Sequence, residues 1–364
     1  MDIEQKNKVA GNSEINDIRT SSQFKGVSFS KFKNTDVRKQ YFDNMKKGKV
    51  EQACYWCAEL LCAGHIMDIW ENIFHYIGKH IHIGNPKIIL YLEKRYEIFR
   101  NIMSQGQYTN ELQVRNNPTI RDLLAEITCV ITMSNKKNSF EPIKINKTEE
   151  YDITQMTERL ISPSVLYIEP IFQKDDPKEL FIALNEFAYN ISKDKLNMVN
   201  ACYWLEWIIE FENICKKRKM KCKYMARNYN VENKFKKDNI WIIWDILLYY
   251  VDLLNNEYIS QLMNSLLKIF CIKYTSASCK KRRYLLYFAI SLLTENIPTN
   301  IELISDKNII KIVVSKINII YKQIKKNEES PNTEYLFANL EKENTFEQSM
   351  RKMNMVNSMD FMTR

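Results

Sequence analysis

The chain has 364 residues, of which 45% are hydrophobic and 12% aromatic, and it contains only 7 glycines and 8 prolines. That composition excludes a disordered chain and a turn-rich all-β protein, and the length allows two domains with sizeable cores. The formal net charge of +9 suits an acidic partner, such as nucleic acid, an anionic membrane or an acidic protein surface. Nine cysteines, an odd number scattered among apolar residues, indicate reduced thiols and an intracellular location.

No segment of the sequence resembles a signal peptide or a membrane span. Residues 1–12 are polar and charged, without the apolar stretch of a secretory signal. The most apolar later run, 240–254, is short for a bilayer and is interrupted by Asp245 and Asp252. We therefore expect a soluble protein with no membrane partner.

The first part of the chain is predicted to be a flexible arm, residues 1–23, followed by short helices. Phe24–Lys33 alternates apolar with polar residues, as an extended segment packed on the body would. Asn85-Pro86 supplies a cap and a first-turn proline for one helix, and Asn116-Asn117-Pro118 opens another. Apolar periodicity predicts helices over 35–46, 49–63, 67–80, 85–103 and 119–133.

A polar loop over 134–148, rich in Lys and Asn, predicts a boundary between two helical domains at about residue 150. Further helices are predicted over 177–191, 196–215, 240–254, 258–274, 284–294 and 308–324. The predicted organisation is an N-terminal helical domain over 24–150, a C-terminal helical domain over 151–325, and a loosely ordered tail over 326–364.

One tetrapeptide occurs twice in the chain. Ala53-Cys-Tyr-Trp56 and Ala201-Cys-Tyr-Trp204 are identical, and each follows a lysine-rich turn. Four identical residues can arise by chance, but the shared context equally fits a repeated helical-hairpin unit. The predicted fold is therefore all-α, a two-lobed array of helical hairpins.

The cluster Cys54, Cys57, Cys62 and His65 contains the ligand types of a structural zinc site. The three cysteines fall within one predicted helix and project from one side of it. A single helix face cannot surround an ion without ligands from elsewhere. We therefore favour buried core cysteines and expect no bound metal.

Catalytic motifs are missing from the sequence. His75 and His82 are seven residues apart and suit one helix face, but no His-Glu-x-x-His pattern accompanies them. No glycine follows Gly106, so the glycine-rich loops that cradle phosphates or dinucleotides have no counterpart there. The sequence predicts a protein that is not an enzyme and uses no cofactor, with an enzyme built on the histidine-rich stretch as a lower-ranked alternative.

The window 216–237 contains ten Lys or Arg residues and only Glu232 as an acid, so it carries the whole net charge of the chain. Aromatic residues interleave with these cations, a combination used for phosphate contact and base stacking, although a solvated lysine-rich face explains it equally well. Lys280-Lys-Arg-Arg283 is a second patch, which supports binding if both share a surface. The predicted nucleic-acid-binding residues are Lys216, Lys217, Arg218, Lys219, Lys221, Lys223, Tyr224, Arg227, Lys280, Lys281, Arg282 and Arg283.

Three stretches resemble a known protein family. The residues from Gln52 to Gly64, the Gly84-Asn-Pro-Lys87 helix start and the residues from Arg121 to Asn138 are similar to the helical C-terminal, clamp-loader collar-like domain of replication-fork AAA+ ATPases. The resemblance covers roughly 49–140, and the ATPase module of that family is missing here. The whole Lys-, Asn- and Ile-rich chain also resembles conserved uncharacterised proteins of large DNA viruses, which implies a host cytoplasmic, nuclear or virion location.

These observations lead to two expectations about function. The first is a non-catalytic helical accessory or assembly factor that binds nucleic acid in viral replication or genome maintenance, the context that the resemblance implies. The alternative is a virion structural or scaffold protein whose basic patch meets acidic protein surfaces. Either role predicts protein partners or a homo-oligomer in addition to any nucleic acid.

Overall fold

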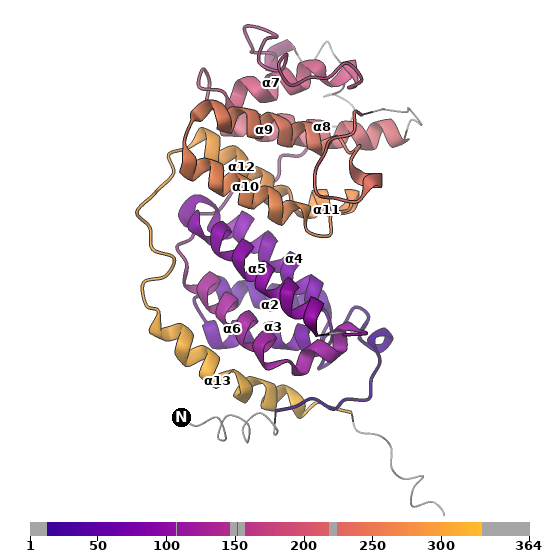
Figure 1. Ribbon diagram of the computed structural model, residues 1–364, viewed down its shortest axis with the longest axis vertical. Helices are drawn as coiled ribbons and strands as arrows, with labels where there is room; N and C mark the ends of the chain where they lie inside the picture. Colours follow the sequence, from indigo (N-terminus) through magenta and orange to yellow (C-terminus); the bar gives the residue numbers. More distant parts are fainter. Residues whose placement is uncertain (1–12, 107, 146–150, 152–156, 218–223, 330–364) are drawn as a thin grey trace, which may run out of the picture.

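The computed structural model describes residues 13–329 except 107, 146–150, 152–156 and 218–223. Within these ranges the chain forms helices and no β-strand, and a single isolated antiparallel bridge joins Val27 and Lys33. The all-α prediction is confirmed. Figure 1 shows the helices in two groups, stacked one above the other along the long axis of the molecule.

The first lobe is organised around helix α3. Two neighbouring helices, α2 and α6, pack along α3, and its Leu60, Leu61 and Cys62 side chains are completely or almost completely buried. The helices of this lobe are α2 (Asn34–Lys46), α3 (Val50–Cys62), α4 (Ile66–Tyr76), α5 (Lys87–Gln105) and α6 (Pro118–Met133). Their bounds follow the predicted segments closely, because each has an apolar stripe at helical spacing.

The second lobe is organised around helix α12, which contacts α8, α9 and α10. Every residue from Tyr284 to Leu293 is buried, so α12 is apolar on all sides, as a central helix must be. The helices of this lobe are α7 (Phe181–Ile191), α8 (Met198–Lys217), α9 (Ile240–Leu254), α10 (Glu257–Cys271), α11 (Ser276–Lys281) and α12 (Arg283–Thr294). The buried apolar residues of both lobes form one continuous cluster.

The repeated tetrapeptide takes the same position in two helices. Ala53 and Ala201 are each the fourth residue of their helix, α3 or α8. Each helix packs against the one before it, α2 or α7, so both belong to helical hairpins. In both copies the Tyr and Trp rings meet edge to face, with their centroids 5.3 Å apart.

One of the two predicted helix caps forms and the other does not. The Asn117 side chain accepts a hydrogen bond from the Ile120 amide, with Pro118 in the first turn, as predicted. Asn85 makes no such bond. Its side chain is fully buried, and its amide donates to the carbonyls of Glu302 and Leu303 at 3.2 and 3.0 Å. Asn85 therefore fixes the segment that connects the second lobe to the last helix.

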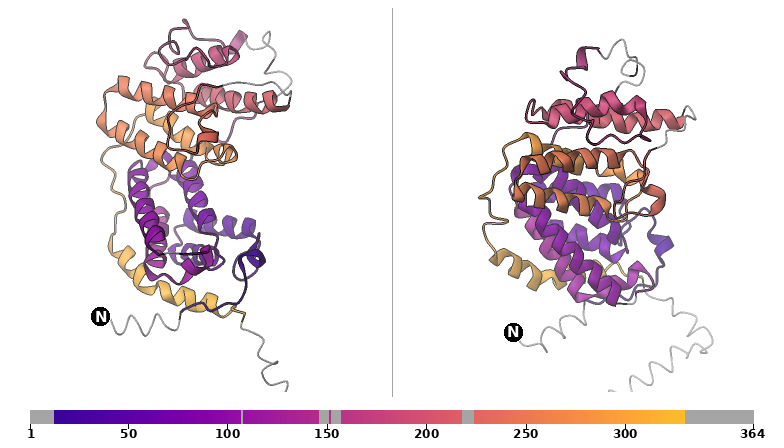
Figure 2. Two further views of the ribbon diagram at one scale, coloured as in Figure 1. Left: turned by 45° about the vertical axis from the view of Figure 1, so that its right-hand side comes forward. Right: turned by 45° about the horizontal axis from the view of Figure 1, so that its top comes forward.

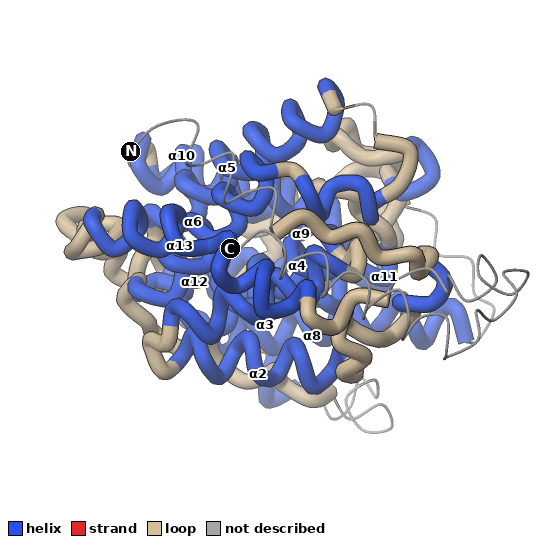
Figure 3. Tube along the Cα trace, turned by 90° about the horizontal axis from the view of Figure 1, so that it is seen from below, coloured by secondary structure: helices blue, strands red, loops and turns tan. Residues whose placement is uncertain are grey.

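The last helix, α13 (Asn308–Lys325), belongs to the first lobe. It packs against α3 and α6, with Ile317, Ile320 and Ile324 buried there. Figure 2 shows the chain descending from the second lobe to reach it, and Figure 3 shows α13 lying across the end of the first lobe. The predicted C-terminal domain over 151–325 is therefore wrong at its end, because the α13 residues bury their apolar face against α3 and α6 rather than against the preceding helices.

The segment before α2 is also held on the body. Residues 13–20 run along the first lobe, where Ile15 has an exposed fraction of only 1%. The prediction of a flexible arm over 1–23 is thus wrong for residues 13–23, while residues 1–12 lie outside the described ranges. The physical reason is a set of polar contacts that sequence periodicity does not reveal, because its two halves are about 300 residues apart.

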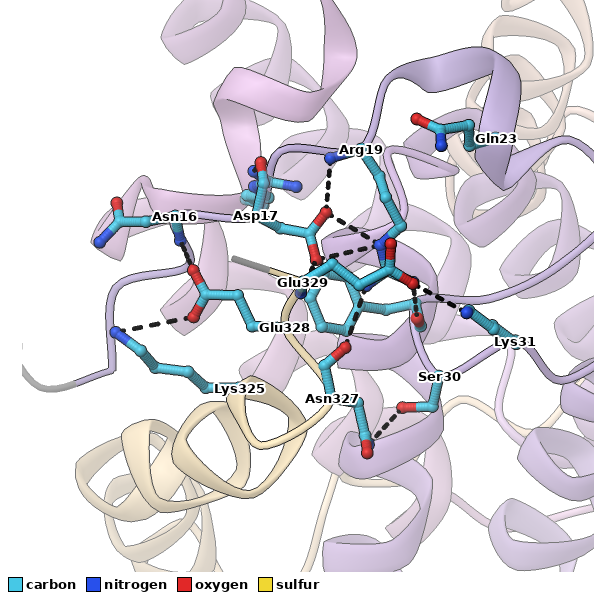
Figure 4. Close-up of polar contacts among 12 residues, drawn as sticks. Asn16, Asp17, Arg19, Gln23, Ser30, Lys31, Lys325, Asn327, Glu328 and Glu329 are labelled. Atoms are coloured by element: carbon cyan, nitrogen blue, oxygen red, sulfur yellow. Dashed lines mark hydrogen bonds and ion pairs between the residues drawn. The ribbon is translucent and has the colours of Figure 1, made fainter. Parts of the chain in front are cut away.

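We call these contacts the terminal clasp, formed by Asp17, Arg19, Asn327, Glu328 and Glu329 (Figure 4). The Arg19 guanidinium binds the Asp17 carboxylate at 2.6 Å and donates to the Asn327 carbonyl at 3.1 Å. The Glu329 amide donates to the same Asp17 carboxylate at 2.8 Å. The clasp thus joins the start of the described chain to its end.

The electrostatics of the clasp depend on burial. Neither the Asp17 nor the Arg19 side chain is more than 4% exposed. Burial alone would raise the pKa of Asp17, but hydrogen bonds from Arg19 and the Glu329 amide outweigh it and hold the pKa below its ordinary value. A buried pair of this kind is costly to break, because either partner alone is an uncompensated charge.

We expect Asp17→Asn to lower the free energy of unfolding by about 3 kcal/mol, because Arg19 would remain buried without its carboxylate. Lys31→Gln is the matched control, since Lys31 makes an exposed ion pair with Glu329 at 2.8 Å and should cost less than about 0.5 kcal/mol. Urea unfolding followed by circular dichroism measures both. Equal losses in the two variants would contradict a central role for the buried pair.

The two lobes meet at a short π-helical turn, Ile77–Ile81, which packs against α12. A side chain at Gly78 would meet the Tyr284 backbone at 2.8 Å, so only glycine permits this approach. Just beyond the turn, the His82 ring stacks on Phe288 with centroids 5.1 Å apart. Burial lowers the pKa of both His82 and His75 to about 4.

This junction predicts that stability falls in mild acid. Both histidines titrate near 4 in the folded chain and near 6.5 when unfolded, so between these values the unfolded state binds more protons. The free energy of unfolding should be at its full value above pH 6.5 and should decline toward pH 4, with His82 contributing up to about 1 kcal/mol per pH unit. Urea titrations at several pH values test this, and His82→Asn should flatten the dependence. An unchanged slope in that variant would show that His82 is not responsible.

Candidate nucleic-acid interface

The predicted basic window begins at the end of α8. Lys217, the last residue of that helix, is exposed to solvent. Lys216 lies in α8, but its side chain is outside the described part of the structure. The other predicted cations of the window that follow in the sequence, Arg218, Lys219, Lys221 and Lys223, also lie outside the described residues.

Two predicted residues of the window are buried in the second lobe. The Arg227 side chain is 4% exposed and binds the carboxylates of Asp176 and Asp245, both at 2.5 Å. Tyr224 is 7% exposed. Their assignment to an exposed nucleic-acid surface is therefore wrong for this structure. Tyr224 belongs to the buried core, and Arg227 joins its segment to Asp245 of α9 and to Asp176 in the loop before α7.

The second predicted patch lies at the junction of α11 and α12. Lys281 is exposed, whereas Arg282 is 1% exposed and is directed inward. Its guanidinium pairs with the Glu71 carboxylate of α4 and donates to the Phe270 carbonyl at 2.6 Å. Arg282 is thus a structural link between the lobes, and its predicted role in nucleic-acid binding is also wrong.

The second basic segment lies beside α8, the helix at whose end the first segment begins. Lys280 approaches the Glu210 carboxylate at 3.6 Å, and Arg283 approaches that of Glu206 at 3.4 Å, so α11 and the start of α12 lie along α8. Lys217 lies on α8, about two turns beyond Glu210. We define the basic edge as Lys217, Lys280, Lys281 and Arg283.

A cleft between the lobes continues this edge. Its volume is about 490 Å³, and it is lined from the second lobe by Lys280, Lys281 and Arg283 and from the first lobe by α2 and α4. Arg38 of α2 adds a further exposed cation to this wall. Sequence reasoning missed Arg38, because nothing near it in the chain indicates that a second lobe would place three cations opposite.

The cleft also contains acidic and aromatic groups. Asp68 and Glu71 line its first-lobe wall, and Glu71 is neutralised by its pair with Arg282. His75, whose ring packs edge-on against Tyr284, is uncharged at neutral pH because burial lowers its pKa to about 4. Lys280 and Arg283 are balanced in the same way by Glu210 and Glu206. Arg38 and Lys281 then face the single carboxylate of Asp68, a small positive excess that favours an anionic ligand.

The cysteine and histidine cluster is part of the first-lobe core. Cys54, Cys57 and Cys62 are between 0 and 3% exposed, which confirms the prediction of core thiols. Burial raises the pKa of the Cys57 thiol to about 11, so it is protonated at neutral pH. The His65 Nε2 lies 2.9 Å from the Phe24 carbonyl instead. No His, Cys, Asp and Glu group suited to a metal occurs among the described residues.

Comparisons with known proteins give no indication of family or function. No protein-family model matches the chain, and neither a curated protein nor a solved structure resembles it significantly. In the described part of the chain, none of the helices combines the length and the apolar character needed to cross a bilayer.

Because Arg227 is buried and paired with two carboxylates, we expect it to stabilise the fold rather than to contact a ligand. Arg227→Gln should lower the free energy of unfolding by about 3 kcal/mol, because it leaves two carboxylates without their cation, one of them fully buried. Lys237→Gln, which changes an exposed cation of the same segment, should change stability by less than about 0.5 kcal/mol. Chemical unfolding measures both variants, and a stable Arg227→Gln protein would contradict this assignment.

Proposed function

We propose that this protein is a non-catalytic accessory factor that binds nucleic acid through the basic edge and the adjoining cleft. Phosphate oxygens are the expected ligands, since exposed lysines and a partly exposed arginine bind them without reading the base sequence. The proposal therefore predicts an affinity that depends strongly on salt and weakly on sequence.

The observation that carries the proposal is the contact of α8 with α11. The Lys280–Glu210 and Arg283–Glu206 pairs hold the second lysine-rich segment against α8, and α8 ends at the exposed Lys217, about 60 residues earlier in the chain. Arg38 extends the same surface across the cleft.

The resemblance of residues 49–140 to the collar-like domain of replication-fork ATPases is the support for proposing a role in replication or genome maintenance. The stretch covers α3 to α6 of the first lobe, and α4 lines part of the cleft. The rival proposal, a scaffold protein, uses the same cations against acidic protein surfaces. The two proposals differ in the ligand, so a direct binding measurement separates them.

The test compares the wild type with a triple variant, Lys217→Gln, Lys280→Gln and Lys281→Gln. Fluorescence anisotropy with labelled single-stranded and duplex oligonucleotides, measured over a range of salt concentrations, gives the affinity and its salt slope. We expect the variant to bind at least about tenfold more weakly, with a slope smaller by up to about three.

A matched control carries Lys307→Gln, Lys311→Gln and Lys316→Gln. These lysines are exposed at or on α13, which packs on α3 and α6 and lines no part of the cleft, and their loss changes the net charge equally. The control should bind like the wild type. Absence of binding at low salt, or equal losses in both variants, would refute the proposal. Equal affinity for polyglutamate and for nucleic acid would favour the scaffold role.

A further inference from the structure

One face of helix α4 supplies a wall of the cleft between the lobes. The α4 residues that line the cleft are spaced three and four apart, so they lie side by side along the helix. They are Asp68, Glu71, Asn72 and His75. Asp68 is exposed, whereas Asn72 is only 8% exposed. Asn72 is therefore a buried polar group in this wall.

Among the residues that the structure describes, none forms a hydrogen bond with the side-chain amide of Asn72. Buried polar groups are nearly always paired, because an unpaired amide loses its hydrogen bonds to water without compensation. The amide is not sealed in the core, so a molecule in the cleft can reach it. An unpaired amide in the wall of a cleft points to a ligand that pairs with it.

The two polar atoms of this amide favour a ligand that both donates and accepts hydrogen bonds. The Asn72 Nδ2 donates and its Oδ1 accepts. The phosphodiester group of nucleic acid and the carboxylate of an acidic peptide are acceptors only, so either would leave Oδ1 unpaired. The edge of a nucleobase presents donors and acceptors side by side, and asparagine pairs with such an edge through both atoms. The amide therefore favours a base over a phosphate.

The rest of the cleft suits the other parts of a nucleotide. Arg38 and Lys281 supply positive charge for phosphate oxygens. The rings of His75 and Tyr284, with centroids 5.0 Å apart, add uncharged aromatic groups to the lining. The volume of about 490 Å³ is within the range of small-molecule sites, about 300–1,000 Å³. The cleft is thus large enough for a nucleotide.

We infer that the cleft takes an unpaired nucleotide of a single strand, with the Asn72 amide bound to the edge of its base and Arg38 and Lys281 beside its phosphates. This inference rests on the proposed binding of nucleic acid and adds which form is bound. In a duplex the base edges lie inside the grooves, which a concave wall cannot enter. Because each base has a donor and an acceptor on its pairing edge, the contact requires no particular sequence.

Three labelled oligonucleotides of equal length test the inference: a thymidine single strand, an abasic single strand with the same number of phosphates, and a duplex. Fluorescence anisotropy at one low salt concentration gives the three affinities. The wild type should bind the thymidine strand about tenfold more tightly than the abasic strand, because only the first offers base edges to the amide.

Asn72→Leu removes the donor and the acceptor and nearly preserves the side-chain volume. It should lower the affinity for the thymidine strand about tenfold and leave the affinities for the abasic strand and the duplex unchanged. Thr35→Trp, at an exposed position of α2 that lines the cleft, should obstruct the site and lower the affinity for the thymidine strand as well. Gln40→Trp is the matched control, since Gln40 is exposed on the same helix but lies outside the cleft.

The outcomes separate this inference from the proposed function. Circular dichroism confirms that each variant is folded, and the Gln40→Trp protein should bind like the wild type. Equal affinities of the wild type for the thymidine and abasic strands would overturn the inference and leave phosphate binding at the basic edge intact. Unchanged affinity of both Asn72→Leu and Thr35→Trp for the thymidine strand would do the same. No binding to any of the three ligands would refute the proposed function and the inference together.

Discussion

The buried guanidinium of Arg282 is the interaction on which the arrangement of the two lobes depends. It pairs with Glu71 of the first lobe, donates a hydrogen bond to the Phe270 carbonyl in the second, and lies over the Phe74 ring at 5.7 Å. With an exposed fraction of 1%, it has no access to solvent as an alternative partner. Separation of the lobes would break these contacts, so the charge strongly favours the closed arrangement.

The same residue sets the direction of its neighbours. Because Arg282 points inward between α11 and α12, Lys280, Lys281 and Arg283 are left to the outer side of the junction and to the cleft. Of this run of four cations, Arg282 is therefore buried, and the other three line the cleft. Because the charge of Arg282 is neutralised by Glu71, only three of the four neighbouring cations repel one another at this edge.

Two ends of the molecule have different chemistry. The terminal clasp closes the first lobe by bringing Asp17 and Arg19 against residues 327–329. The second lobe has its basic edge on one side and an apolar groove around Leu166 and Leu253 on another.

The sequence by itself determined the helical class and nearly every helix, because apolar spacing and caps such as Asn117 are local signals. It also determined that Cys54, Cys57 and Cys62 belong to the core. It could not determine that α13 returns to the first lobe, or that Arg227 and Arg282 are buried. The residues near an arginine in the sequence look the same whether its side chain is solvated or paired with a carboxylate far away in the chain. Only the tertiary structure decided which charges are paired, because Asp176 and Glu71 reach these arginines across 51 and 211 residues of chain.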